Sequence, residues 1–330
     1  MMVLGSRAAL VVNAAWQPRE DRMTPRSTPR QIESVAVVGA GTMGWQISAL
    51  CAASGRAVTL FDADPMAGQR AIDRMRVEIP AAQSTSRLGI ELPASTDDLV
   101  SRVRLASTLA DAVGDADLVI EAVREEIDIK RGVFRQLDQL APSAILATNS
   151  SSYPSAELVP AVSDHSRLLN LHFFSPIWER PMLEVMGCGH TDDEVIESAA
   201  AFGRSLGLVT AVVRGQSKGF IINRVWRAVK RESLRVVDEG HADPEDVDRL
   251  WMLFFGTPAG PFGIMDMVGL DVVADIEASY AAVSPDPTDT PSATLHTLIA
   301  EGKLGEKTNF GFYRHPDPDY RQPGWLLQND

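Results

Sequence analysis

Apolar residues in the first two thirds of the chain gather in short, β-branched runs that alternate with amphipathic stretches. Residues 35–38 form the first run, which ends at glycines, and helix-type spacing follows over residues 43–53. Residues 126–140 place apolar side chains at helical spacing, as a crossover helix between parallel strands requires. The alternation predicts a mostly parallel α/β sheet. The further strand-like runs cover residues 58–61, 118–123, 145–148, 168–174 and 182–185.

The remainder of the chain has helical spacing only. Residues 220–239 form a long amphipathic pattern that Gly240 would end as a C-cap. Asp243, followed by Pro244, would begin the next helix, because an acidic N-cap and a proline in the first turn are typical of helix starts. The last two helical patterns lie near residues 266–283 and 290–302.

These patterns predict the domain organisation. Residues 1–31 show no sustained periodicity, and we expect either a disordered extension or a mis-assigned start with Met23 as the true initiator. We expect a sheet domain over residues 32–215, an all-helical domain over residues 216–315 and an irregular, proline-rich tail over residues 316–330.

Composition restricts the class of protein further. The 330 residues carry 31 Lys and Arg against 44 Asp and Glu, a formal net charge of −13. This balance argues against a nucleic-acid partner, because phosphate contacts need clustered basic side chains. No apolar run reaches the ~18–20 residues that cross a bilayer, so we expect a soluble, cytoplasmic protein with no membrane partner. Cys51 and Cys188 are too few for a disulfide framework or a zinc site, and we expect no bound metal.

The first chemical signal is a glycine-rich turn between the first strand and helix. The sequence Gly-Ala-Gly-Thr-Met-Gly that starts at Gly39 fits the G-x-G-x-x-G fingerprint of dinucleotide-binding turns. Gly39 would permit the tight turn, Gly41 would let the backbone approach a pyrophosphate, and Gly44 would allow close helix packing. Thr42 and Met43 lie at the N-terminus of the following helix, whose N–H groups would face phosphate.

An acidic residue supports the dinucleotide interpretation. Asp62 ends the second predicted strand, eighteen residues after Gly44, where a carboxylate can accept hydrogen bonds from the adenosine ribose. With Asp64 nearby, it would repel a 2′-phosphate, so the sequence favours NAD over NADP as the cofactor. The alternative is a glycine-rich turn that holds no ligand.

The second signal is a pair of polar residues in apolar strands. His172 lies near the end of the run 168–174, and Glu184 lies within the run 182–185. Burial of an unpaired carboxylate is costly, and pairing with an imidazole would remove that cost and raise the basicity of the histidine. Such a pair suits proton exchange with a hydroxyl whose carbon gives hydride to nicotinamide. Taken singly, each residue also fits a structural role in the core or on a solvated strand face.

Two more polar positions accompany this pair. Ser151 belongs to a serine-rich segment after the run 145–148, at the carboxyl end of a strand, where α/β ligand sites form. The same segment could simply cap a helix. Asn223 interrupts the apolar spacing of the long helix, and its amide could orient a substrate carbonyl or bond to backbone at a helix seam.

Jointly, in their order and spacing, these motifs resemble the L-3-hydroxyacyl-CoA dehydrogenase family, which includes 3-hydroxybutyryl-CoA dehydrogenases. The likeness covers residues 33–314. The segments that carry it are Val-Gly-Ala-Gly-Thr-Met-Gly (38–44), Asn-Ser-Ser-Ser (149–152), His-Phe-Phe-Ser-Pro (172–176), Glu184, Gly-Phe-Ile-Ile-Asn-Arg (219–224), Gly-Pro-Phe (260–262) and Gly-Lys-Leu-Gly-Glu-Lys-Thr (302–308). The resemblance implies a Rossmann-type NAD domain, a helical dimerisation domain, a homodimer, and a substrate held where its 3-carbon meets the nicotinamide.

The resemblance also implies roles for individual residues. His172 would be the general base in oxidation and the general acid in reduction, and Glu184 would orient it. Ser151 and Asn223 would hydrogen-bond the substrate oxygen, with Ser151 close to the cofactor as well.

Four further positions match cofactor contacts of the family. Glu125 and Lys130 match positions near the cofactor, and Lys307 matches a lysine that approaches it from the second domain. Ser175 stands where the family commonly has asparagine beside the nicotinamide. Asn309 replaces the usual glycine after Lys-Thr, a change that a left-handed backbone tolerates.

The sequence does not decide which group is attached to the hydroxyacyl part of the substrate. We expect NAD-dependent oxidation of an L-3-hydroxyacyl-CoA in fatty acid metabolism, or the reverse reaction. Arg74 and Arg76 could attract the phosphates of CoA, or lie on a solvated helix face. Arg180 could clamp the carboxylate of a free hydroxy acid, as the resemblance to L-gulonate dehydrogenase/lambda-crystallin and carnitine dehydrogenases implies, or pair with Glu179 or solvent. A carrier-protein-bound hydroxyacyl substrate stays open too, as does a protein that binds NAD without catalysis.

Overall fold

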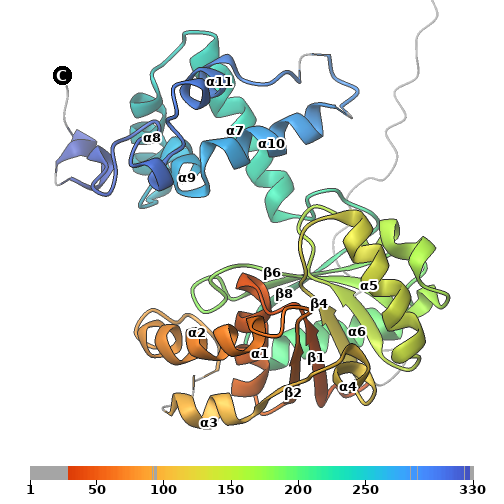
Figure 1. The fold of residues 1–330 in the computed structure, drawn as a ribbon. Coiled ribbons are helices and arrows are strands. Elements are labelled where there is room, and N and C mark those ends of the chain that lie inside the picture. Colours follow the sequence, from red (N-terminus) through yellow and green to blue (C-terminus); the bar gives the residue numbers. More distant parts are fainter. Residues whose placement is uncertain are drawn as a thin grey trace, which may run out of the picture. The chain divides into compact units, whose positions relative to one another are not determined.

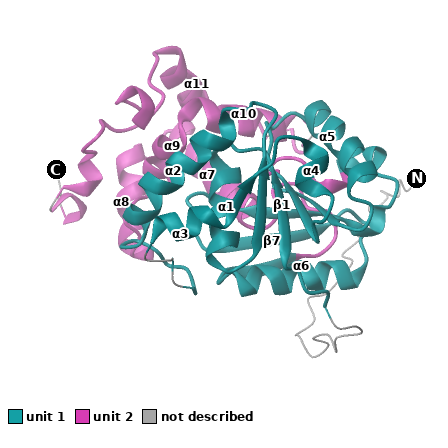
Figure 2. Ribbon diagram, turned by 60° about the horizontal axis from the view of Figure 1, so that its bottom comes forward, with its two compact units in different colours: residues 1–149, 157–212 teal, residues 150–156, 213–330 magenta. Residues whose placement is uncertain are grey.

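The computed structural model describes residues 29–90, 92, 95–282, 284–287, 289–322 and 324–327. The expectation for the extension before residue 29 lies outside the described residues. Figure 2 shows two compact units in different colours. Of the described residues, the first unit contains those up to residue 149 and residues 157–212, and the second contains residues 150–156 and those from residue 213 onward.

The first unit is built on an eight-stranded sheet with the order β3-β2-β1-β4-β5-β6-β7-β8 (Figure 1). Strands β1 to β6 pair in parallel, and β7 runs antiparallel to β6. The predicted mostly parallel sheet is therefore confirmed. The strands are β1 (Ser34–Val38), β2 (Ala57–Phe61), β3 (Val103–Leu105), β4 (Leu118–Glu121), β5 (Ile145–Thr148), β6 (Leu168–Phe173), β7 (Met182–Gly187) and β8 (Val209–Val213).

Helices cover both faces of this sheet. Val35 and Val37 of β1 point into one core, with α1, α2, α3 and α6, while Ala36 and Val38 point into the other, with α4 and α5. Burial on both faces explains why these strands are continuous apolar runs and do not alternate. The helices are α1 (Thr42–Ala53), α2 (Ala67–Ala82), α3 (Thr96–Ser101), α4 (Leu109–Val113), α5 (Ile127–Leu140) and α6 (Asp193–Ser205), with 3₁₀ turns at Ser155–Ala161 and His165–Arg167.

The second unit is helical, as the sequence predicts. Asp243 occupies the N-cap of α8 with Pro244 in the first turn, although its side chain makes no capping hydrogen bond. Gly240 follows the end of α7 with a φ of 73°, the left-handed conformation expected after a helix. The elements are α7 (Ile222–Asp238), α8 (Pro244–Phe255), α9 (Pro261–Val268), α10 (Leu270–Ala281) and α11 (Ala293–Ala300), with 3₁₀ turns at Glu306–Thr308, Asp319–Arg321 and Trp325–Leu327.

The last described residues of the chain contribute to the core of the second unit. The rings of Tyr320 and Trp325 are buried and lie edge-on to Tyr313, with centroid distances of 5.0 and 6.4 Å. Tyr320 also packs on Gly263, where an added Cβ would lie 2.8 Å from the tyrosine ring. The segment expected to be an irregular tail therefore supplies two of the aromatic side chains of this core.

A buried carboxylate joins three parts of the second unit. Asp248 of α8 accepts hydrogen bonds from the N–H groups of Phe262 and Gly263 at 2.9 and 2.8 Å, and from the hydroxyl of Tyr313 at 3.0 Å. Burial nevertheless raises the pKa of Asp248 to about 6, because loss of water costs the charged form more than these bonds return.

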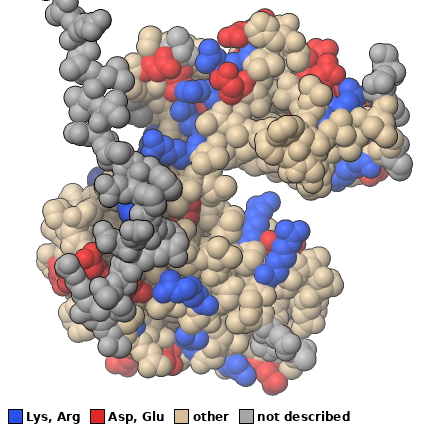
Figure 3. Space-filling model, turned by 180° about the vertical axis from the view of Figure 1, so that it is seen from behind, with Lys and Arg blue, Asp and Glu red and all other residues tan. Residues whose placement is uncertain are grey.

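The charged side chains and the two cysteines are the features that the composition brings out. Figure 3 shows one face, on which acidic and basic side chains are both scattered among uncharged ones. Among the described helices, none is both long and apolar enough to cross a membrane. Cys51 and Cys188 are buried, and burial raises the pKa of the Cys51 thiol to about 12, as suits a small packing residue.

Candidate active site

The glycine turn has the geometry that a dinucleotide requires. Gly39 has a φ of +107°, and a Cβ there would lie 2.5 Å from the carbonyl oxygen of Ala122. A Cβ on Gly44 would lie 1.8 Å from the carbonyl oxygen of Gly39, so only glycine lets α1 pack so closely. At Gly41, in contrast, a Cβ would meet no atom within 4 Å. The residues fit a pyrophosphate, because the backbone at Gly41 is open beside the N-terminus of α1.

Asp62 lies beside this turn at the end of β2. Its two carboxylate oxygens accept hydrogen bonds from the backbone N–H groups of Ala40 at 2.7 Å and Asp64 at 2.9 Å. Each oxygen keeps a second lone pair, so the carboxylate can still accept a ribose hydroxyl. Asp64 forms an ion pair with Arg70, and the hydrogen bond from Arg70 lowers the pKa of Asp64. Because Arg70 offsets the charge of Asp64, repulsion of a 2′-phosphate falls chiefly to Asp62.

His172 and Glu184 face each other across the β6–β7 pair. The antiparallel register places them directly opposite, and His172 Nδ1 lies 2.9 Å from Glu184 Oε2. Both side chains are buried, with exposed fractions of 5% and 6%. Since a carboxylate only accepts hydrogen bonds, Nδ1 carries the proton, and Nε2 is the basic nitrogen of the neutral ring. The centroid of the Phe174 ring lies 4.3 Å from that of the imidazole, and this contact limits the orientation of the imidazole.

The end of β5 is tied to the end of β6 by an asparagine. Asn149 Oδ1 accepts a hydrogen bond from the N–H of Phe173 at 3.0 Å. The chain then turns, and Ser150 Oγ accepts a hydrogen bond from the N–H of Tyr153 at 2.8 Å. Ser151 is exposed on this turn, within the segment 150–156 that is grouped with the second unit.

A buried ion pair at the end of β4 supports the next turn. Lys130 Nζ lies 2.8 and 3.2 Å from the two carboxylate oxygens of Glu121 and 3.0 Å from Glu125. Glu121 also accepts hydrogen bonds from the Thr148 hydroxyl at 2.6 Å and the Val123 N–H at 2.7 Å. Lys130 and Glu125 are among the residues predicted from the sequence, whereas Glu121 is not. The sequence feature that could have revealed Glu121 is an acidic residue at the end of an otherwise apolar strand.

Gln46 is a second residue that the sequence patterns do not reveal. It is buried on α1, one turn after Thr42, and its side chain contacts the loop that follows His172. Gln46 Nε2 donates to Ser175 Oγ at 3.0 Å, and Gln46 Oε1 accepts from the N–H of Ile177 at 3.0 Å. The structure thus places Ser175 next to the helix that begins at the glycine turn.

The remaining predicted residues lie in the second unit. Asn223 is half-buried in the first turn of α7. Lys307 lies in a 3₁₀ turn, and its ammonium forms an ion pair with Asp271 of α10. Asn309 follows with a φ of +58°, which confirms that asparagine adopts the left-handed backbone expected there. Whether Ser151, Asn223 and Lys307 serve the site around His172 stays a prediction.

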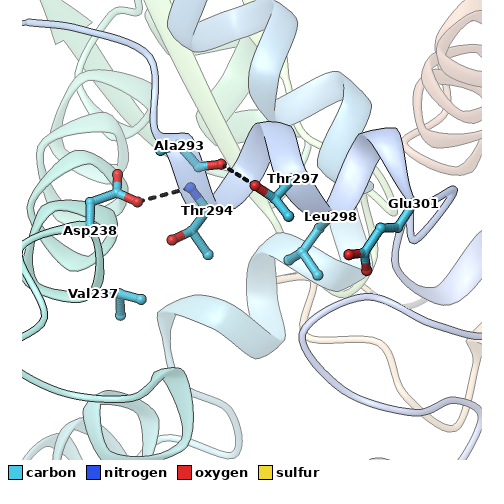
Figure 4. Close-up of a pocket in the computed structure, with 7 residues that line it drawn as sticks. All are labelled: Val237, Asp238, Ala293, Thr294, Thr297, Leu298 and Glu301. Carbon is cyan, nitrogen blue, oxygen red and sulfur yellow. Dashed lines mark hydrogen bonds between the residues drawn. The ribbon is translucent and has the colours of Figure 1, made fainter.

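A surface pocket of about 370 Å³ lies elsewhere, between the end of α7 and α11 (Figure 4). Asp238 accepts a hydrogen bond there from the N–H of Thr294 at 2.9 Å. None of the predicted site residues lines it. Its lining residues are Val237, Asp238, Ala293, Thr294, Thr297, Leu298 and Glu301.

The Rossmann-type sheet, its glycine turn and the acidic residue after β2 define an NAD-dependent oxidoreductase. Comparison with known proteins gives the family. The model of the 3-hydroxyacyl-CoA dehydrogenase NAD binding domain matches residues 34–216, and that of the 3-hydroxyacyl-CoA dehydrogenase C-terminal domain matches residues 219–315. The chain belongs to the 3-hydroxyacyl-CoA dehydrogenase family, and its cofactor is NAD.

Three relatives illustrate the range of this family. A probable 3-hydroxyacyl-CoA dehydrogenase of Caenorhabditis elegans is 35% identical, over 88% of this chain and 99% of the relative. The crystal structure of (S)-3-hydroxybutyryl-CoA dehydrogenase from Ralstonia eutropha is 29% identical with a TM-score of 0.79, over 87% of this chain and all of that one. A 5-formyl-3-hydroxy-2-methylpyridine 4-carboxylate 5-dehydrogenase of Mesorhizobium japonicum is 33% identical, over 86% of this chain and 90% of the relative.

Proposed function

We propose that the protein interconverts an L-3-hydroxyacyl-CoA and the corresponding 3-ketoacyl-CoA with NAD, as a step of fatty acid metabolism. The observation that carries the proposal is the buried pair of His172 and Glu184, 2.9 Å apart at the end of β6. This end of the parallel sheet is also the edge at which the glycine turn lies. An acid–base pair beside a nicotinamide site is the arrangement that alcohol oxidation needs.

In the oxidation direction, His172 Nε2 takes the proton of the substrate hydroxyl. NAD, when bound, supplies the acceptor for the hydride that leaves the same carbon. Glu184 holds the Nδ1–H tautomer of His172 and stabilises the imidazolium that forms. Ser151 and Asn223 hydrogen-bond the substrate oxygen. In the reverse direction, His172 returns the proton.

The cofactor contacts follow from the same geometry. The open backbone at Gly41 and the N–H groups at the start of α1 hold the pyrophosphate, and Asp62 holds the adenosine ribose. Lys130 is paired with both Glu121 and Glu125, so it acts on the cofactor by fixing the turn that carries Glu125. The full set that we propose comprises Gly39, Gly41, Thr42, Met43, Gly44, Asp62, Glu125, Lys130, Ser151, Ser175 and Lys307.

The test is the variant His172→Gln, with His190→Gln as a control on an exposed histidine. Loss of the general base is expected to lower kcat with acetoacetyl-CoA and NADH by ~10²–10⁴-fold. NADH affinity, measured by fluorescence titration, should stay near that of the unaltered protein. A variant that retains most of its turnover would show that His172 is not the proton-transfer group.

A second candidate substrate is a free hydroxy acid. The contacts of two arginines of the first unit support this candidate. Arg76 pairs with Asp73 and Asp97 at 3.6 and 3.4 Å, which reduces its attraction for the phosphates of CoA. Arg180 is exposed and donates to the carbonyl of Ser175 at 2.6 Å. Because guanidinium carries five N–H groups, Arg180 can also bind a carboxylate near the His172 strand.

A substrate comparison separates the two. Acetoacetyl-CoA, L-gulonate and L-carnitine would be assayed by NADH absorbance, with the same acyl group on a carrier protein as a further arm. We expect the highest kcat/KM with the CoA ester. A preference for a free acid that is lost in Arg180→Gln would instead assign the second candidate.

We also propose that the protein is a homodimer through its helical unit. Helix α8 leaves large apolar side chains in solvent, with Phe254 83% and Leu250 69% exposed, and such faces commonly mark interfaces. Light scattering coupled to gel filtration should give twice the chain mass. Phe254→Asp should give the mass of one chain, and an unaltered protein that is already monomeric would contradict the proposal.

A further inference from the structure

Both the amide nitrogen and the amide oxygen of the Gln46 side chain form hydrogen bonds. It is 3% exposed, and it bridges the first turn of α1 to the loop after β6. Gln46 Nε2 donates to the carbonyl oxygen of Thr42 and to Ser175 Oγ, each at 3.0 Å. Gln46 Oε1 accepts from the N–H of Ile177 at 3.0 Å. Both N–H bonds of the amide and its oxygen are therefore used.

This network fixes the direction of every hydrogen bond in it. The Ile177 N–H can only donate, so it must face Gln46 Oε1, and the Thr42 carbonyl can only accept, so it must face Nε2. It follows that Ser175 Oγ accepts from Gln46. Because a serine hydroxyl has one proton, that proton must be donated in another direction.

The position of Ser175 indicates what receives the proton. In a doubly wound sheet, the half that contains β1 and β2 binds the adenosine side of the dinucleotide, and the half that contains β4 to β6 binds the nicotinamide side. Ser175 follows the carboxyl end of β6 by two residues, and Gln46 connects it to Thr42 at the glycine turn, where the pyrophosphate is proposed to bind. The acceptor on the nicotinamide ring is the oxygen of its carboxamide.

We propose that Gln46 is a positioning residue that presents the Ser175 hydroxyl as a hydrogen-bond donor to the nicotinamide carboxamide. The proposal uses the NAD site of the proposed function and is independent of the substrate and of His172. In this role Gln46 must supply a hydrogen-bond donor at Nε2 and an acceptor at Oε1. A residue that only fills space in the helix would not need these groups.

Two nearly isosteric variants test the direction of these bonds. Ser175→Ala removes the donor. Gln46→Glu keeps an acceptor for the Ile177 N–H but replaces the amide donor with a carboxylate oxygen, so the Ser175 proton would turn toward position 46. Binding of NADH would be followed by fluorescence titration at pH 6 and pH 9. ADP-ribose, which lacks the nicotinamide, would be titrated in parallel, with Ser163→Ala and Gln136→Glu as matched exposed controls.

We expect each variant to weaken NADH binding by ~3–10-fold, the range for one hydrogen bond, and to leave ADP-ribose binding unchanged. The double variant should lose no more than either single variant, because both remove the same contact. The loss in Gln46→Glu should grow from pH 6 to pH 9, as the buried carboxyl ionises and ceases to be a donor.

Three results would overturn the proposal. These are unchanged NADH affinity in Ser175→Ala, an equal loss of ADP-ribose affinity, and losses that add in the double variant. Should Gln46→Glu fail to fold, Ser175→Ala and the ADP-ribose control still decide the question. Failure of His172→Gln to lose turnover would refute the proposed catalysis and leave this binding result untouched.

Discussion

Replacing Gly41 by alanine should separate NAD binding from folding. Gly41 is the N-cap of α1 with extended backbone, φ −70° and ψ −163°, which alanine adopts without strain. The new methyl would meet no protein atom within 4 Å. An alanine N-cap costs ~0.5–1 kcal/mol, and the smaller entropy of the unfolded chain offsets about 0.4–1 kcal/mol of this. The free energy of unfolding should therefore change by less than about 1 kcal/mol.

NAD affinity should respond far more strongly, since the methyl would occupy the space that the pyrophosphate needs. Loss of one hydrogen bond from a backbone N–H to a charged phosphate costs ~1.5–3 kcal/mol, or ~10–150-fold in Kd. Gly44→Ala is the contrasting variant, because its Cβ would lie 1.8 Å from a backbone oxygen. It should lower the free energy of unfolding by about 3 kcal/mol as well as weaken binding.

The assay pairs fluorescence titration of NADH with urea unfolding of the full chain. The expected pattern is a normal unfolding midpoint with weak binding for Gly41→Ala, and a lowered midpoint for Gly44→Ala. Gly41→Ala that binds NADH as tightly as the unaltered protein would refute a pyrophosphate at this turn.

The buried ionisable groups give three more predictions. Glu184→Gln should lower kcat by ~10²-fold or more with little change in NADH affinity, and normal turnover would exclude its role in orienting His172. Lys130→Met should lower the free energy of unfolding by ~3–5 kcal/mol, because Glu121 stays buried without its counter-ion, and adding Glu121→Gln should recover much of the loss in urea titrations. The pKa of Asp248 is raised from 3.8 to about 6, so the folded state binds more protons there than the unfolded state, and this group makes stability fall as the pH rises from about 4 to 6. In Asp248→Asn that fall should be smaller by about 3 kcal/mol, and an unchanged slope in urea titrations at several pH values would contradict the raised pKa.

The parts of the fold that the sequence predicts are those with local signals. Strands buried on both faces are continuous apolar runs, and the glycine turn has a fixed spacing, so both are visible without coordinates. Strand β3 is three residues long and contains Arg104, so it gives no apolar run. Strand β8 is mostly apolar in sequence, but most of its side chains are partly or fully exposed, and it is absent from the predicted strands.

The candidate site is only partly predictable for a related reason. The residue types of His172 and Glu184 are visible, but their contact depends on the antiparallel register of β6 with β7, which no local period encodes. Glu121 ends a strand and its partner Lys130 lies on the following helix, nine residues later. That spacing is not the period of a strand or of a helix, so no local pattern predicts the contact. Gln46 lies on a helix whose buried residues are mostly apolar, and its partner Ser175 is 129 positions away.

The aromatic packing at the end of the chain has a practical consequence for protein engineering. Since Tyr320 and Trp325 fill the core around Tyr313, truncation before residue 319 would open a hole the size of two rings in the helical unit. Fusions and affinity tags should therefore be appended after these rings, never substituted for them.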